Sequence, residues 1–267
     1  GVGLAVLAAL GLTIAPVYLL LWMLYSSVFM VGQQFLHFQW DVLLLETGVA
    51  AVFLAPMTLS KAPVPMTGIV LFRVTLFKLM FMSGIVKLQS RCPTWQELTA
   101  LDYHYATQCL PTPLGWYAHQ LPANLQQASV ALMFVVQLPA AFMVLVALRG
   151  VRVVAAWAQI LLQTLILLTG NYNWFNALTI LLSVSLLDDD LWPVSLLAHA
   201  GDRPWPRRRI LRVAKYLQIL GAVAALLFAG LQMFDCSLTD EPHRPLWARV
   251  RVRWALSVAQ ISQAVPR

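Results

Sequence analysis

Charged side chains are scarce in this sequence: Asp, Glu, Lys and Arg together make up 11% of its 267 residues. A soluble domain typically carries about 25% charged and about 45–50% apolar residues, whereas 60% of these residues are hydrophobic and the mean hydropathy is +0.73. So few charges exclude a water-covered surface for a chain of this length. The apolar residues also come in blocks close to the roughly 17–25 residues that cross a bilayer, which predicts a multi-pass membrane protein.

Recognisable catalytic and nucleotide-binding motifs are missing as well. No nucleophile-and-base arrangement, phosphate-binding glycine loop or nucleotide fingerprint is visible, so we expect no catalytic residue and no cofactor. His104 and His119 show no recognised metal-ligand spacing beyond the nearby Cys92 and Cys109. We therefore expect no metal site, and we interpret both histidines most simply as hydrogen-bonded groups of a folded loop.

The apolar blocks predict an all-α transmembrane bundle with about eight membrane segments and one substantial loop, residues 89–123. The bundle would occupy residues 1–234 and include a basic linker at 188–212, and a truncated basic tail would follow at 235–267. The first block is short for a span, so we expect the chain to be a fragment whose true start lies upstream. The expected segments are 1–14, 17–35, 42–57, 66–88, 125–148, 153–169, 174–187 and 213–234.

The formal net charge of +7 comes from basic residues at the ends of apolar blocks rather than on one soluble face. This is the pattern of cytoplasmic loops in membrane proteins, and we expect no binding to nucleic acid. Helix counting then puts Lys61, the Arg149–Arg152 link and the basic linker on the cytosolic side. The loop 89–123, the turn at Gly170 and the tail would lie on the opposite side, although the tail's own arginines argue against its placement there.

Five charged residues lie in or directly beside two of the predicted segments. Asp41 precedes the segment 42–57, which contains Glu46, and Arg73, Lys78 and Lys87 lie in the segment 66–88. A charge at membrane depth is costly enough to be a candidate functional group. The simplest interpretation is that the carboxylates pair with the cations across two helices; a pocket or a proton-handling site is the alternative. Asp41 and Lys87 lie near segment ends, where they can also snorkel to the interface.

Three cysteines are too few for a dense disulfide scaffold. Cys92 and Cys109 fall in the same predicted loop, on the side opposite the cytosol. Their spacing permits a disulfide in an oxidising compartment and permits two free thiols equally well.

Three stretches of the sequence resemble the lipase maturation factor family. The longest, residues 71–122, reads LFRVTLFKLMFMSGIVKLQSRCPTWQELTALDYHYATQCLPTPLGWYAHQLP. The others read FQWDVLLLETG at 38–48 and TGNYNWFNALTILLSVSLLDDD at 169–190. The three stretches occur in the family's order, and the resemblance covers most of the chain up to about residue 190. The sequence departs from the family at Ala106, where the family has Glu, and it lacks the large C-terminal region expected after the membrane domain.

The resemblance implies a multi-pass protein of the endoplasmic reticulum membrane that assists folding, assembly and secretion of lipases of the lipoprotein lipase type. Its partners would be the client lipase and the bilayer, and it would not be an enzyme. The alternative is an intramembrane enzyme, because the family is similar in architecture to the vitamin K-dependent carboxylase group. The candidate residues for client contact in the loop are Trp95, Tyr103, His104, Tyr105, Gln108, Trp116 and His119.

Overall fold

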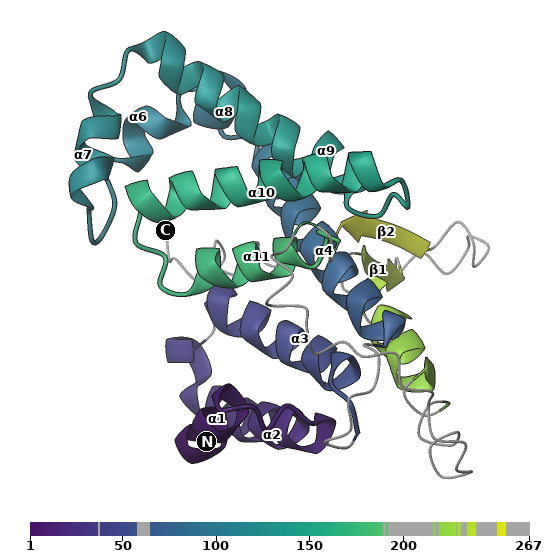
Figure 1. The fold of residues 1–267 in the computed structure, drawn as a ribbon. Helices are drawn as coiled ribbons and strands as arrows, with labels where there is room; N and C mark the ends of the chain where they lie inside the picture. Colours follow the sequence, from purple (N-terminus) through teal and green to yellow (C-terminus); the bar gives the residue numbers. More distant parts are fainter. Residues whose placement is uncertain are drawn as a thin grey trace.

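The computed structural model describes residues 1–36, 38–57, 65–188, 191, 216, 219–227, 229–230, 234–238 and 250–254. The described part is a bundle of helices with a small sheet beside it (Figure 1). The helices are α1 (Val2–Ala9), α2 (Ala15–Gly32), η1 (Gln33–Leu36), α3 (Gln39–Leu54), α4 (Met66–Gln89), α5 (Pro93–Gln96), α6 (Ala100–His104), α7 (Pro113–His119), α8 (Ala123–Gln137), α9 (Pro139–Met143), α10 (Arg149–Thr169) and α11 (Phe175–Val184).

Four helical segments are long and apolar enough to cross a membrane: α2, α4, α8 together with α9, and α10. The sequence predicts about eight, and the difference has a physical origin. The apolar blocks at the positions of α1, α3 and α11 do form helices, but these are 8, 16 and 10 residues long, and a span needs about 20. Nearly all of the expected linker lies outside the described residues, and of the expected last segment, 213–234, only residues 216, 219–227, 229–230 and 234 are described.

The helices α2, α3, α11 and α10 lie side by side in this order, and α4 crosses them (Figure 1). Two glycines on α4 permit its close contacts. A Cβ on Gly68 would lie 2.4 Å from the Cα of Leu54 on α3, and a Cβ on Gly84 would lie 2.6 Å from the side chain of Leu138. Small residues at such positions let membrane helices approach closely. Leu138 itself marks the break between α8 and α9, because Pro139 cannot donate a backbone hydrogen bond.

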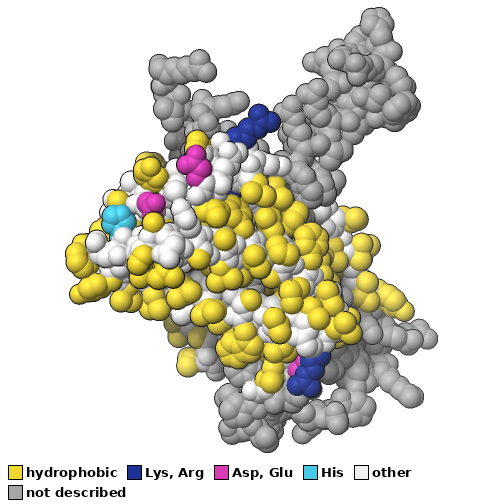
Figure 2. Space-filling view, turned by 90° about the horizontal axis from the view of Figure 1, so that it is seen from above, with side chains coloured by type: hydrophobic (Ala, Val, Ile, Leu, Met, Phe, Trp, Pro, Cys, Tyr) yellow, Lys and Arg dark blue, Asp and Glu magenta, His cyan; other side chains and the backbone are white. Residues whose placement is uncertain are grey.

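The interior of the bundle is partly polar. The core is built from aliphatic side chains such as Leu76 and Met80, but fully buried amides and hydroxyls lie within it. Large hydrophobic side chains are exposed along every candidate span, and Figure 2 shows them spread over most of one described face, with charged side chains toward its margins. This distribution suits a protein whose solvent is lipid. The buried polar residues on α10 and α11 are Arg152, Gln159, Gln163, Asn176, Thr179 and Ser183.

The two ends of the bundle differ in content. At one end, here called the loop end, residues 90–122 meet the turn at Gly170, and at the other end α9 leads into α10 near Asp188 (Figure 1). The predicted loop and the predicted Gly170 turn therefore share one end, and the Arg149–Arg152 link lies at the other.

The expected tail contains a two-stranded antiparallel sheet, β1 (Phe234–Leu238) paired with β2 (Val250–Trp254). Phe234 pairs with Trp254 and Leu238 with Val250. The all-α prediction thus describes the bundle, and this hairpin is an addition to it.

Candidate functional site

Glu46 on α3 and Lys78 on α4 form an ion pair inside the bundle. Lys78 Nζ donates to Glu46 Oε1, and the side chains are 13% exposed for Lys78 and 24% for Glu46. The close contact of α3 and α4 at Gly68 brings their facing sides together. This is the arrangement expected from the sequence, in which a carboxylate and a cation neutralise one another across two helices.

Asp41 takes a different partner. Its side chain is 1% exposed, and its Oδ1 accepts a hydrogen bond of 2.5 Å from the hydroxyl of Tyr25 on α2. Its Oδ2 is buried without a hydrogen-bond partner among the described residues. Asp41 lies in the first turn of α3, where the helix dipole favours a negative charge. It therefore links α2 to α3 rather than pairing with a cation of α4.

The remaining cations of α4 lie far apart. Lys87 donates to the carbonyl of Ser83 at 2.8 Å and to Gln137 Oε1 at 3.0 Å, and its Nζ lies 5.3 Å from the ring centre of Trp95. Arg73 lies toward the other end of the bundle, where it is repelled by the charge of Arg152 and attracted by that of Asp188. Fourteen residues of helix separate Arg73 from Lys87, a rise of about 21 Å. The five predicted charges therefore do not form one cluster.

We expect each of the single substitutions Glu46→Leu and Lys78→Leu to destabilise the bundle more than the double substitution does. Either single change leaves one charge at membrane depth, which costs about 2.5–3.5 kcal/mol on insertion scales, whereas the double change leaves none of the pair. Unfolding of all three variants in mixed micelles measures the coupling as a double-mutant cycle. A double variant whose loss equals the sum of the two single losses would contradict the pairing.

The loop between α4 and α8 is held against the bundle by hydrogen bonds. The Nε2 atom of His104 lies 2.8 Å from the hydroxyl of Tyr172, in the turn between α10 and α11. Gln108 Nε2 donates to the carbonyl of Thr169 at 3.1 Å, and Thr112 Oγ1 donates to the carbonyl of Leu168 at 3.1 Å. The loop thus caps the last carbonyls of α10, which have no partner within the helix.

A second set of contacts ties the loop to itself and to α8. The Nε2 atom of His119 lies 3.0 Å from the carbonyl of Asp102, so the end of α7 is joined to α6. Gln126 on α8 is 3% exposed, and its Nε2 donates to the carbonyls of His119 at 3.0 Å and Leu121 at 3.3 Å. The loop is therefore a small folded unit rather than an extended connection, and the histidines serve in it as hydrogen-bonded groups.

Burial changes the proton affinity of the groups where the loop meets the Gly170 turn. It lowers the pKa of His104 below its ordinary value and raises the pKa of Tyr172. It also raises the pKa of Tyr105, an effect that a hydrogen bond to Thr169 opposes. All three shifts favour the neutral form in the docked loop.

Docking of the loop should weaken as the pH falls. The undocked His104 takes up a proton near its usual pKa of about 6.5, while the docked side chain resists protonation, so docking stability is constant above that pH and declines below it. Hydrogen exchange of the loop amides above and below this pH measures the change. The variant His104→Gln is the control, because its exchange should lose this pH dependence; a loop equally protected at both pH values would contradict the prediction.

Most of the candidate client-contact residues are used in internal contacts. Trp95 packs against Lys87 and stands edge to face with Phe134, at 6.2 Å between ring centres. His104, Gln108 and His119 make the hydrogen bonds described above, and Tyr105 is half-buried. Tyr103 and Trp116 remain well exposed, at 61% and 60%. Of the seven candidates, these two are the ones most open to a partner.

The two loop cysteines are free thiols in the structure. Cys109 is exposed, and Cys92 Sγ lies 3.1 Å from Thr94 Oγ1. Hydrogen bonding to Thr94 lowers the pKa of the Cys92 thiol. A disulfide between them stays a prediction. Within the described part of the chain, no three His, Cys, Asp or Glu residues are grouped so that they could hold a metal ion.

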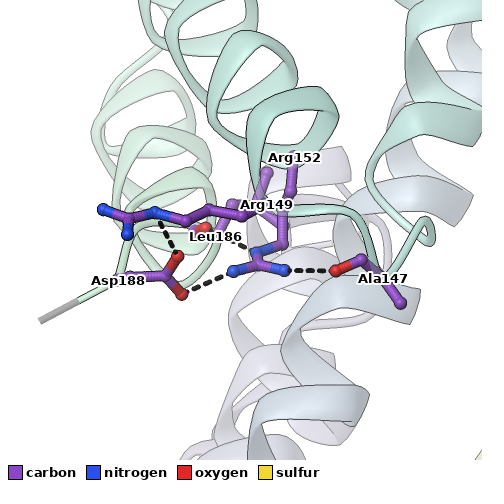
Figure 3. Close-up of polar contacts among 5 residues, drawn as sticks. All are labelled: Ala147, Arg149, Arg152, Leu186 and Asp188. Carbon is purple, nitrogen blue, oxygen red and sulfur yellow. Dashed lines mark hydrogen bonds and ion pairs between the residues drawn. The ribbon is translucent and has the colours of Figure 1, made fainter.

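The other end of the bundle holds a polar clamp that the sequence did not reveal (Figure 3). Arg152 on α10 is 8% exposed and donates three hydrogen bonds: from Nε to the carbonyl of Leu186 at 2.9 Å, from Nη1 to the carbonyl of Ala147 at 3.0 Å, and from Nη2 to Asp188 Oδ1 at 2.5 Å. Arg149 Nε lies 3.2 Å from Asp188 Oδ2. This clamp joins the segments that follow α9 and α11 to the start of α10.

One signal for the clamp is present in the sequence. Arg149 and Arg152 are three positions apart at the start of a helical block, so they share a helix face, and the acidic run that begins at Asp188 ends another block. Charges at loop boundaries usually indicate which side of the membrane a loop lies on. This interpretation of the arginines does not predict that they pair with Asp188.

Comparisons with known proteins agree on one family. The family model for the lipase maturation factor transmembrane domain matches residues 1–194. Lipase maturation factor 2 of Gallus gallus is 45% identical over 226 residues, covering 81% of this chain and 32% of the relative. The same-named protein of Homo sapiens is 43% identical over 272 residues, covering 92% of this chain and 38% of the relative.

A more distant relative is lipase maturation factor 1 of Mus musculus, 37% identical over 175 residues that cover 63% of this chain and 30% of the relative. The chain thus spans about a third of the length of the curated relatives it matches. No solved structure matches it.

Proposed function

Because the chain belongs to the lipase maturation factor family, we propose that it is a membrane platform for the folding, assembly and secretion of lipases. We place this platform in the endoplasmic reticulum membrane, with the loop end in the lumen and the Asp188 end in the cytosol. The clients would be secreted lipases of the lipoprotein lipase type. The names of the relatives support the process, and the basic residues at the Asp188 end support the orientation.

The observation that carries the proposal is the fixed presentation of the loop. A folding helper needs a surface that stays in place while its client changes shape, and a preordered surface avoids the cost of ordering it at each encounter. The bonds from His104, Gln108 and Thr112 hold this loop on the ends of α10 and the following turn. Tyr103 and Glu97 are both exposed on this loop, so they are available to a client.

The relatives are named as maturation factors, not as enzymes. The buried carboxylates and cations that could favour an intramembrane enzyme contact neighbouring helices: Glu46 with Lys78, Asp41 with Tyr25 and Lys87 with Gln137. No specific observation among the described residues favours the enzymatic alternative.

The proposal predicts that Tyr103→Ala combined with Glu97→Lys, in the full-length factor, lowers secreted lipase activity several-fold. These side chains are exposed and make no buried contact, so the factor itself should accumulate normally. The assay uses cells that lack the endogenous factor, and it measures lipase activity in the medium against the amount of factor in the cells.

The matched control is Trp157→Ala, which removes an aromatic side chain of 56% exposure from α10, in a candidate span. We expect it to leave secretion near the unsubstituted level. Equal secretion from the loop variant and the control, at equal amounts of factor, would rule out client contact through this part of the loop.

A further inference from the structure

The second half of the loop carries no formal charge. Residues 103–148 contain no Asp, Glu, Lys or Arg, whereas the first half of the loop holds Arg91, Glu97 and Asp102. A surface covered by water usually has about 25–35% charged residues. The segment that follows Tyr103, up to the start of α8, therefore has the composition of a surface that is not fully covered by water.

The short helix α7 lies within this uncharged half, against the end of a candidate span. The hydroxyl of Thr112 donates to the carbonyl of Leu168 and accepts a hydrogen bond of 3.0 Å from the amide of Gly115. Gly115 is buried, and a Cβ there would lie 2.6 Å from the carbonyl oxygen of Thr169. Because Thr169 is the last residue of α10, α7 lies at the level where this span ends.

The opposite face of α7 is apolar and exposed. Leu114 and Tyr117 are three residues apart, which places them on one side of the helix, and Leu121 follows two residues after the helix ends. The three side chains are 49%, 65% and 45% exposed. Trp116 lies beside them, with its ring centre 5.0 Å from that of Tyr117. Trp and Tyr with aliphatic neighbours are typical of the interface between lipid and water, where one part of the ring is apolar and the other is wet.

This face continues into the exposed surface of a candidate span. Leu125 at the start of α8 is 50% exposed, and Leu132, about two turns later, is 57% exposed. Figure 2 shows hydrophobic side chains that extend across the described face toward the loop end. This uncharged surface runs from a candidate span onto α7 without interruption. We therefore expect lipid to contact the part on α7 as it contacts the part on the span.

We propose that the outward face of α7, formed by Leu114, Trp116 and Tyr117 and extended by Leu121 just after the helix, lies in the headgroup region of the bilayer at the loop end. The occupant of this face is the lipid surface, and α7 is an interfacial helix. Trp116 is then withdrawn from the set of client-contact candidates. The charged first half of the loop, with Tyr103, is the part that meets the aqueous compartment.

Site-directed spin labelling in phosphatidylcholine vesicles tests the placement. The three cysteines, Cys92, Cys109 and Cys236, are replaced by Ser, and single cysteines are introduced as Tyr117→Cys or Leu121→Cys. Two reference positions bracket the result: Glu97→Cys reports the water-exposed half of the loop, and Leu132→Cys reports the lipid-facing side of α8. Each label is then measured for collision with oxygen, which enriches in lipid, and with a water-soluble nickel chelate.

We expect labels at Tyr117 and Leu121 to collide several-fold more with oxygen and several-fold less with nickel than the label at Glu97, at a depth shallower than that at Leu132. Nickel collisions equal to those at Glu97 would overturn the proposal and return the face to the aqueous compartment, where a protein client could bind it. Labels protected from both reagents would also overturn it, by showing that another protein segment covers α7. Because the readout is local to each label, it does not depend on lipase maturation.

Discussion

Replacing Arg152 with Ala should destabilise the bundle by several kcal/mol, because each buried backbone carbonyl left without its donor costs about 1–3 kcal/mol. The substitution removes three hydrogen bonds at once: the carbonyls of Leu186 and Ala147 lose their donor, and Asp188 keeps its contact with Arg149. Those groups lie at the junction of three segments, so the loss should loosen the Asp188 end as a whole. The thermal midpoint of the purified protein in detergent, and its resistance to protease, measure the effect.

Two further variants separate the guanidinium geometry from its charge. Arg152→Lys keeps the charge, but its single ammonium group cannot match the planar fork that reaches three acceptors, so we expect an intermediate loss. Arg149→Ala removes the neighbouring arginine, whose side chain is 55% exposed, and an exposed pair is worth about 0–1 kcal/mol. If Arg152→Ala were no more harmful than Arg149→Ala, the clamp would not hold the bundle together.

Expressed alone in cells that lack the factor, the 267-residue chain should enter the membrane yet leave secreted lipase activity at the level of the deficient cells. It spans about a third of the length of its relatives. At the loop end, the described residues form a single folded surface of moderate size, which is the loop itself. A standard protein interface buries about 800 Å² on each partner, more than the few exposed side chains near Tyr103 provide. The client surface would then be shared with regions outside this chain.

The full-length factor, expressed at the same level in the same cells, is the positive control for this experiment. Membrane insertion of the shorter chain is checked by its resistance to extraction with alkaline carbonate. Full rescue of lipase secretion by the shorter chain would show that the loop and the bundle suffice, and the proposed division between platform and client-binding regions would be wrong.

Composition predicted the environment of this protein, and helical blocks predicted most of its helices. The number of spans was harder to predict, because hydropathy locates an apolar block but not the residue at which its helix stops. α3 is an example: the block runs to Met57, while the helix ends at Leu54, and its first turn contains the buried Asp41. Only tertiary contacts, such as the hydrogen bond from Tyr25, make that carboxylate tolerable inside the bundle.

For the candidate site, the sequence located the charged residues and the loop but not their partners. The pairing of Glu46 with Lys78 could be expected, since opposite charges on neighbouring spans attract. The contact of His104 with Tyr172 joins positions 68 residues apart, and no local pattern encodes such a distance. The same holds for Arg152, whose acceptors are mostly backbone carbonyls, and any residue type can supply those.

The hydrogen bond between α10 and α11 has a consequence for biogenesis. Asn176 Nδ2 on α11 donates to the backbone carbonyl of Gln163 on α10 at 3.2 Å, and both side chains are almost fully buried. α11 alone would carry the unmatched amide donor of Asn176 into hydrocarbon as it left the translocon, at a cost of about 1–3 kcal/mol. The two helices, joined by the tight turn at Gly170, are therefore suited to leave the translocon together as a preassembled hairpin.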